Sequence, residues 1–358
     1  MKNFMIVLLI MIFTSCEKET NQDDLQNPGN NDKGEWLIPS DEIFDGGPGK
    51  DGIPALENPL SGPSTDSEHD YLEDSDLILA VDFAGNKKAY PHPVLDWHEI
   101  ANDEISDKAY AVNYCPLTGT GMAWNRILNG EKTSFGVSGL LYNTNLILYD
   151  RLTDSYWSQM SLMSVKGELS GQSPEIYPMI EMKWETWKEL YPDEQTVIPP
   201  DNYSRPYGSY PYGEYKTNND YLLFPVSVED NRLPQKERVF AVVGDKDNAK
   251  IYRYNQNAGE YVFIRDEFLQ MDYIVAGINR DFLVAWKENT MDGDKLKLNI
   301  VENKLPVLFK DESGSEWDIF GNAISGSNKG KKLEKITFIN GFWFTFPSFF
   351  NNVEIHAE

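Results

Sequence analysis

The chain has 358 residues, of which 57 are Asp or Glu and 32 are Lys or Arg, so its formal net charge at pH 7 is −25. Such an acidic surface repels phosphate backbones, which argues against binding to nucleic acid. Cys16 and Cys115 are the only cysteines, so the chain is not built on a framework of disulfide bonds. Nine tryptophans and an aromatic share of 13% supply ample apolar material for a folded core.

The first fifteen residues have the order of a signal peptide. Lys2 gives the start of the chain a positive charge, and an apolar run follows from Phe4 to Phe13. This run is too short to cross a membrane, which takes roughly 20 residues in a helix. Small residues then precede Cys16, an order that resembles a bacterial lipobox and implies cleavage after Ser15 and a lipid on the Cys16 sulfur. The alternative is an ordinary secretory signal in which Cys16 is incidental.

A lipid on Cys16 would anchor the mature protein in a membrane of the cell envelope, because each buried CH₂ group contributes about 0.8 kcal/mol to membrane binding. The acidic stretch CEKE that begins at Cys16 also resembles the surface-export signals of Bacteroidota lipoproteins. The expected location is therefore the outer membrane, on its periplasmic or its outer face. Residues 16–36 are polar and carry Asn, Gly and Pro, which predicts a flexible tether.

Residues 37–358 are expected to form one domain of the α+β class that is predominantly β. A Gly- and Pro-dense segment at residues 38–59 predicts an extended arm packed onto it. Short runs of β-branched and aromatic residues between turn signals predict strands at residues 76–83, 108–114, 133–139 and 145–150. Residues 182–191 show helical spacing, with Trp184, Trp187 and Tyr191 on one face.

The domain also shows signs of an internal duplication. When the sequence is aligned with itself at one constant offset, Trp124 pairs with Trp286, and at a slightly shorter offset Trp157 pairs with Trp317. This pattern predicts two degenerate β-rich repeats, at about residues 76–200 and 235–358, that form one pseudo-two-fold body. Residues 201–234, rich in Tyr and Gly, would be the connector, an ordered loop that covers part of the domain.

Cys115 and His98 are the candidate site. At the first offset the second repeat has Gly277 at the position of Cys115 and Glu260 at that of His98, so neither side chain recurs. A thiol is nucleophilic or metal-binding as the thiolate, which needs a cation, a metal or an amide-rich turn beside it. The turn CPLTGTG provides such amides. The alternative is that Cys115 is a small buried hydrophobe and His98 a hydrogen-bonded structural histidine.

Two chemistries remain open for the pair. Thiolate and imidazole ligands favour copper or zinc as the metal. In thiol catalysis, Cys115 would be the nucleophile and His98 the base, with Asp96 or Asp103 as the orienting carboxylate. Lesser candidates for the site are Tyr142, Asn143, Asp150, Arg151 and Gln159.

The motifs AYPHPVLDWHEIAND, YCPLTGTGMAWNR and FGVSGLLYNTNLILYDRLTDSYWSQ stand out along the chain. They resemble the motifs of the bacterial domain-of-unknown-function family 3179, and the resemblance covers nearly everything after the tether. The family often has C-P-L-C at the turn and a histidine in W-H-E-I. Cys115 and His98 match these positions, whereas Thr118 replaces the second cysteine. The resemblance therefore implies mononuclear metal binding or one-thiol chemistry in preference to disulfide exchange.

The leading functional hypothesis is thus a lipid-anchored envelope protein that binds copper or zinc, or uses a single thiol, at His98 and Cys115. The rival hypothesis is a non-catalytic surface module that binds glycan or protein. The rival predicts a buried, inert Cys115 and an exposed aromatic strip from Tyr203 to Tyr215.

Overall fold

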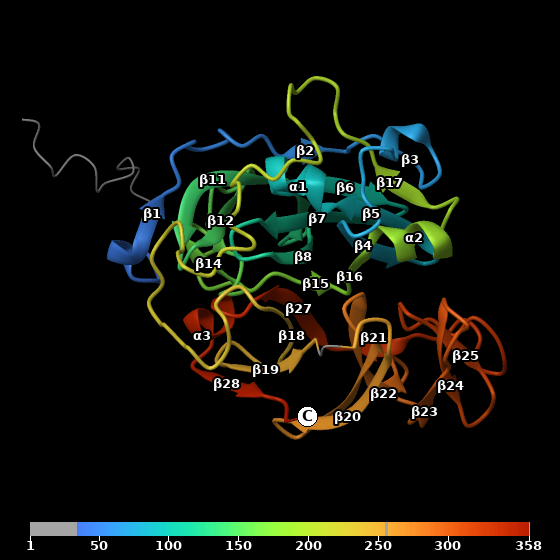
Figure 1. The fold of residues 1–358 in the computed structure, drawn as a ribbon. Helices are drawn as coiled ribbons and strands as arrows, with labels where there is room; N and C mark the ends of the chain where they lie inside the picture. Colours follow the sequence, from blue (N-terminus) through green and yellow to red (C-terminus); the bar gives the residue numbers. More distant parts are fainter. Residues whose placement is uncertain (1–33, 255–256, 358) are drawn as a thin grey trace, which may run out of the picture. The chain divides into compact units, whose positions relative to one another are not determined.

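The computed structural model describes residues 34–254 and 257–357 (Figure 1). The predicted signal peptide (residues 1–15), Cys16 with its predicted lipid, and most of the predicted tether (residues 16–36) lie outside the described residues. Within the described ranges, no helix is long and apolar enough to cross a membrane. All of the sheets belong to one compact unit of the chain.

An extended arm precedes the main sheets, as residues 38–59 predict. Each of its strands joins a different sheet: β1 (Ile43–Asp45) pairs with β11, β2 (Leu56–Glu57) with β6, and β3 (Ser61–Pro63) with β17. Two short 3-10 turns flank them, η2 (Ser40–Glu42) and η3 (Ser67–His69). The arm therefore completes sheets whose other strands lie far along the chain.

The first stretch of the domain, from β4 to β17 (residues 77–197), forms three five-stranded sheets with the arm. The first has the order β16 (Ile180–Lys183), β4 (Leu77–Phe83), β5 (Asn86–Pro91), β17 (Gln195–Val197), β3. The second has the order β15 (Ile176–Tyr177), β8 (Thr120–Asn125), β7 (Lys108–Cys115), β6 (Ile100–Ile105), β2. The third has the order β1, β11 (Phe135–Tyr142), β12 (Asn145–Asp150), β13 (Tyr156–Ser158), β14 (Met163–Lys166), and a small hairpin joins β9 (Ile127–Leu128) to β10 (Glu131–Lys132).

The strands that the sequence predicts are confirmed as β4, β7, β11 and β12. Nearly every residue of these strands is buried, because both faces of each sheet are covered, and this explains why their apolar runs are continuous and not alternating. The predicted helix is confirmed as α2 (Trp184–Leu190), with Met182 and Lys183 belonging to β16 instead. Trp184 and Trp187 point into the core, at 2% and 0% exposure.

The second stretch, from β18 to β28 (residues 238–355), forms three smaller sheets. The first has the order β27 (Thr337–Phe342), β18 (Arg238–Val243), β19 (Asn248–Arg253), β28 (Asn352–Ile355). The second has the order β20 (Tyr261–Phe268), β21 (Met271–Ile278), β22 (Phe282–Thr290), β26 (Leu333–Lys335). The third has the order β23 (Leu298–Ile300), β24 (Val307–Asp311), β25 (Glu316–Asp318). Helix α3 (Thr345–Phe349) lies between β27 and β28. With three short α-helices among the strands of the described residues, the predicted fold class, α+β and predominantly β, is confirmed.

The two stretches share strand order and several side-chain contacts. In the first stretch, β16 pairs antiparallel with β4, β4 and β5 form a hairpin, and β5 pairs parallel with β17; helix α2 joins β16 to β17. In the second stretch, β27, β18, β19 and β28 pair in the same way, and helix α3 joins β27 to β28. Tyr90 and Tyr110 join hydroxyls at 2.6 Å, as Tyr252 and Tyr273 do. These parallels support the predicted duplication, whereas a two-fold relation between the stretches stays a prediction.

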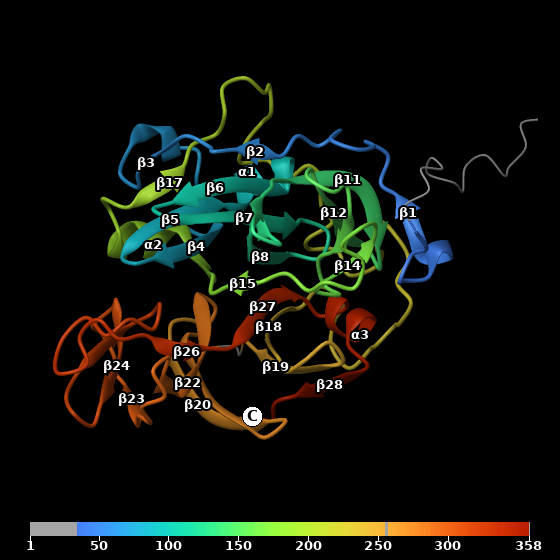
Figure 2. The same cartoon turned by 180° about the vertical axis from the view of Figure 1, so that it is seen from behind.

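The stretches meet along β15 of the first and β27 of the second, which lie side by side in both views (Figures 1 and 2). Lys335 of β26 also reaches the Ile176 carbonyl of β15. The connector, residues 201–234, forms no helix or strand. It is nevertheless tied down: Trp97 donates to the Ser209 carbonyl at 3.0 Å, and Thr144 donates to the Phe224 carbonyl at 2.6 Å. The connector therefore covers one side of the first stretch, as its composition predicts.

Candidate functional site

Cys115 ends β7, and a four-residue turn returns the chain to β8. The Gly119 amide donates to the Cys115 carbonyl at 2.8 Å and closes this turn. Gly119 has a φ of 65°, and a Cβ atom there would lie 2.5 Å from Nη1 of Arg238. Glycine is therefore required twice over, by the backbone conformation and by the close approach of an arginine from β18.

The Cys115 sulfur lies in the core and not in a cleft. The side chain is 1% exposed, and Sγ donates weakly to the Thr144 carbonyl at 3.7 Å. Burial raises the pKa of the Cys115 thiol to about 11, and the neighbouring Glu99 carboxyl adds to the effect. The side chain is therefore a neutral thiol at pH 7, which is a poor nucleophile and a poor metal ligand.

His98 ends α1 (His92–His98), a short helix with Pro93 in its first turn. Its Nδ1 is 2.8 Å from the Pro54 carbonyl, and its Nε2 is 2.6 Å from the Tyr207 hydroxyl. Because a carbonyl can only accept, Nδ1 carries the proton and Nε2 accepts from the tyrosine. Burial lowers the pKa of His98, which keeps the ring neutral. His98 therefore ties the arm to the connector and has no lone pair left for a metal.

The two residues of the predicted site thus have separate partners. His98 bonds to Pro54 and Tyr207, and Cys115 bonds to Thr144, so no hydrogen bond joins the pair. Across residues 34–254 and 257–357, no group of three or more His, Cys, Asp or Glu side chains is placed to hold a metal ion. This geometry favours the interpretation in which Cys115 is a buried apolar residue and His98 a structural histidine over the one in which they form a reactive pair.

The strand register also corrects the residue that corresponds to Cys115. Tyr110 and Tyr273 occupy matching positions, because each joins a tyrosine hydroxyl in the preceding hairpin. Five residues further along each strand lie Cys115 and Ile278, so the counterpart is Ile278 and not Gly277. The offset between matching residues is one residue larger before this turn than after it, because the turn after Cys115 has four residues and the turn after Ile278 has three. An apolar counterpart removes the argument that Cys115 is there for its reactivity.

Glu99 is an ionisable neighbour of Cys115 that was not predicted from the sequence. It follows α1 with a φ of 57°, which ends the helix, and its carbonyl accepts from the Tyr114 amide at 2.7 Å. Its carboxyl makes no hydrogen bond to the described residues, and burial raises its pKa to about 8, with the nearby Asp96 adding to this. The available signal was the W-H-E-I motif, in which Glu99 adjoins the histidine that drew attention.

Asp96 lies beside Glu99 under the connector. Its Oδ2 is 3.2 Å from Lys216 Nζ, whereas Oδ1 has no hydrogen-bond partner among the described residues, and burial raises the pKa of Asp96 to about 6. The aromatic residues of the connector cover this cluster. Tyr215 is 0% exposed, and the Tyr210 hydroxyl donates to the Pro116 carbonyl at 2.9 Å. The expected exposed aromatic strip from Tyr203 to Tyr215 is therefore wrong, because Tyr215 is buried and the other tyrosines of the strip are half-buried against the core.

The lesser candidates serve structural contacts. Gln159 bridges buried groups, accepting from Thr120 and from Asn145, each at 2.7 Å. Asp150 accepts from the Trp157 indole at 3.0 Å. The remaining three fix segments together: Arg151 pairs with Asp51 and Glu57, Asn143 donates to the Ser348 carbonyl, and Tyr142 packs edge-on against Phe349.

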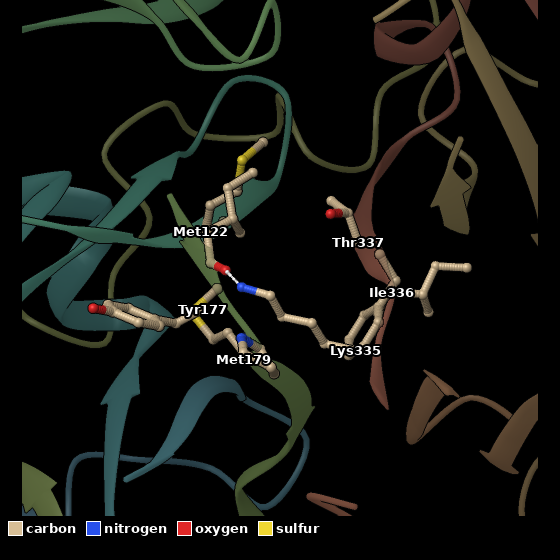
Figure 3. A pocket seen from close by; sticks show the side chains of 10 residues that line it. Met122, Tyr177, Met179, Lys335, Ile336 and Thr337 are labelled. Atoms are coloured by element: carbon tan, nitrogen blue, oxygen red, sulfur yellow. Dashed lines mark hydrogen bonds between the residues drawn. The ribbon is translucent and has the colours of Figure 1, made fainter. Parts of the chain in front are cut away.

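The pocket drawn in Figure 3 lies where the two stretches meet. Lys335 reaches across from β26 and donates to the Ile176 carbonyl at 2.8 Å, close to Met122, Tyr177 and Met179 (Figure 3). The volume of the pocket is only ≈ 20 Å³, which leaves room for about one water molecule. This pocket is a seam between sheets and not a ligand site.

A larger cleft of ≈ 440 Å³ opens elsewhere between the stretches. It is lined by side chains from the start of β4, from β16, from the ends of β18 and β19, and from the β21–β22 turn, namely Ser75, Leu77, Glu181, Lys183, Glu237, Arg238, Arg253, Tyr254, Arg280 and Asp281. Arg238 pairs with Glu181, and Arg253 pairs with Glu237. No sequence motif contains this cleft, because its residues are far apart along the chain.

Fold and cleft together define a mostly β protein that has a charged cleft and, within its described residues, no assembled metal site. A family model described as protein of unknown function, DUF3179, matches residues 50–353. The chain therefore belongs to this family, and the match runs from the arm into β28, as the sequence motifs predict. No curated protein and no solved structure matches the chain.

Proposed function

We propose that this chain is a lipid-anchored binding protein of the cell envelope that does not catalyse a reaction. The observation that carries the proposal is the state of Cys115 and His98, whose polar atoms are buried and engaged in separate structural contacts. The cleft between the stretches, in contrast, is open and lined by polar and charged side chains. A binding role needs such a cleft and does not need a reactive pair.

The anchor is part of the proposal. The apolar run, the small residues and Cys16 support processing to an acylated cysteine, and the polar tether after it would leave the domain room to reach a ligand. Membrane lipid is then a partner through Cys16, at the outer membrane of the envelope.

A soft-metal or single-thiol site at His98 and Cys115 is the competing proposal. Binding of copper or zinc there would require Tyr207 and Pro54 to release His98, and Cys115 to lose a proton in an apolar setting. Both steps oppose metal binding, so we rank this proposal second.

One experiment separates the two proposals. The full chain, purified in detergent, is incubated with copper or zinc, dialysed and analysed for metal, and the rate of Cys115 alkylation is measured in buffer and in urea. We expect no stoichiometric metal, and alkylation at least a hundredfold slower in buffer than in urea. Cys115→Ser is the matched control. About one metal ion per chain that is lost in Cys115→Ser, or fast alkylation in buffer, would overturn the binding-only function.

A further inference from the structure

We propose that the cleft between the two stretches binds a small hydroxylated ligand through one oxyanion group, a carboxylate or a phosphate. The inference rests on the proposed binding function and adds its site and its ligand chemistry. The cleft is open between β16 of the first stretch and β18 of the second, and both strands contribute basic side chains, Lys183 and Arg238.

The charge of the cleft differs in sign from that of the protein. Its lining holds four basic side chains and three acidic ones, whereas the chain as a whole carries a net charge of −25. Acidic residues outnumber basic ones in this chain by 57 to 32, yet four basic side chains line one concave surface. A cleft concentrates the field of the charges that line it, so a small anion repelled by the rest of the surface is attracted here.

Arg238 is held in place with part of its guanidinium unused. Nε donates to Glu181 at 2.8 Å, and Nη2 donates to the Gly119 carbonyl at 2.9 Å. Nη1 makes no hydrogen bond to any residue of the described chain. Because the side chain is fixed by these bonds before a ligand arrives, an oxyanion would meet a donor that loses little further freedom on binding.

Lys183 supplies a second charge for the same ligand. Its backbone amide donates to Asp281 at 3.1 Å, but its ammonium group has no hydrogen bond or ion pair with the described residues. The side chain is half-buried in the lining of the cleft. An ammonium and a guanidinium on neighbouring walls can share the oxygens of one carboxylate or phosphate.

The acidic and hydroxyl groups of the cleft restrict the rest of the ligand. Glu237 and Asp281 would accept hydroxyl protons but would repel a second anionic group. The Tyr254 hydroxyl, which donates to Asn340 at 2.8 Å, can still accept a hydrogen bond. A volume of ≈ 440 Å³ fits a molecule of about monosaccharide size. The ligand class is therefore a small acidic polyol.

Calorimetric titration of the full chain in detergent at low salt tests this inference. The probes are glucuronate, glucose 6-phosphate and glucose. We expect at least one of the two anionic probes to bind, glucose to bind at least tenfold more weakly, and affinity to fall as salt is added. Lys183→Gln should weaken binding of the anionic probe about fivefold or more. The control Lys310→Gln makes the same charge change at an exposed site on β24 and should leave affinity unchanged.

No heat with either anionic probe, equal affinity for glucose, or an unaltered affinity in Lys183→Gln would each overturn the oxyanion site. Such a result would leave the broader binding proposal in place, because that proposal depends on Cys115 and His98 and fails only through metal content or thiol reactivity. Unchanged thermal unfolding of Lys183→Gln would confirm that a lost affinity is local.

Discussion

The two stretches of the domain differ most between their first and second hairpins. In the first stretch, the residues between β5 and β6 form α1 and place Asp96, His98 and Glu99 in the interior. In the second, β19 ends at Arg253 and β20 begins at Tyr261, and the described residues between them form no helix. The connector covers α1, so the buried ionisable cluster belongs to the first stretch alone.

The shared contacts, by contrast, are uncharged or fully paired. The tyrosine pairs recur, each with an aspartate partner: Tyr90 donates to Asp103 at 2.7 Å and Tyr252 to Asp266 at 2.6 Å. This difference separates scaffold from specialisation. Contacts present in both stretches stabilise the sheets. The buried ionisable cluster, which is present in the first stretch alone, lowers the stability of the folded state and is not needed for the shared fold.

The largest expected effect tests the shared scaffold. Asp150 and Asp311 each accept a hydrogen bond from a buried tryptophan, Trp157 or Trp317, at 3.0 Å. Each also accepts from the amide of a following serine. Replacing either aspartate with alanine leaves several buried donors without partners, which should lower the free energy of unfolding by about 5 kcal/mol. Urea denaturation of both variants measures it.

The control for this pair is Asp107→Ala, because the Asp107 side chain is 82% exposed and should matter little. Similar losses in Asp150→Ala and Asp311→Ala would support a common scaffold. If the free energy of unfolding fell by less than about 1 kcal/mol in only one of the two variants, the matching contacts would not contribute equally to stability, and the two stretches would not share this part of the scaffold.

The next effect tests the specialised cluster and depends on pH. Burial raises the pKa of Glu99 from 4.5 to about 8, so the folded state holds this proton more tightly than the unfolded state. The carboxyl therefore costs no stability below pH 4.5, and its cost grows as pH rises to about 8. Glu99→Gln removes the ionisation and should raise stability by about 3 kcal/mol at pH 9, with little change at pH 4.

Thermal and urea unfolding of Glu99→Gln at pH 4, 7 and 9 measure this effect. Glu260→Gln serves as the control, because Glu260 is an exposed glutamate just before β20 and the substitution removes the same carboxyl. A gain that is equal at pH 4 and pH 9 would show that ionisation of Glu99 is not its source. A loss at pH 9 would mean that the carboxylate has a stabilising partner.

Local patterns predicted much of the fold. Continuous apolar runs identified β4, β7, β11 and β12, and the spacing of Trp184 and Trp187 identified α2. Helix α1 was not predicted, because seven residues that include a proline give too little periodicity. The sheets themselves depend on pairings between distant segments, such as β1 with β11, which no local pattern contains.

The site was harder to predict for a related reason. His98 was a candidate because it does not recur in the second repeat and matches the family motif, but its partners Pro54 and Tyr207 lie more than forty residues away on either side. Glu99, the next residue, has a positive φ of 57°, and its buried carboxyl raises the pKa of the Cys115 thiol. The cleft gathers side chains from five separate segments, so its excess of positive charge becomes visible only in three dimensions.

The smallest expected effect sharpens the match between Cys115 and Ile278. If Cys115 is a packing residue, valine should replace it at a cost below about 1.5 kcal/mol, since the swap keeps the position apolar and of similar size. The weak bond from Sγ to the Thr144 carbonyl is lost in this variant. Ile278→Val is the matched control and should cost about 1 kcal/mol. Urea denaturation compares the two. A loss above about 3 kcal/mol in Cys115→Val alone would show that the sulfur does more than fill space, and the two strand ends would then differ in chemistry as well as in sequence.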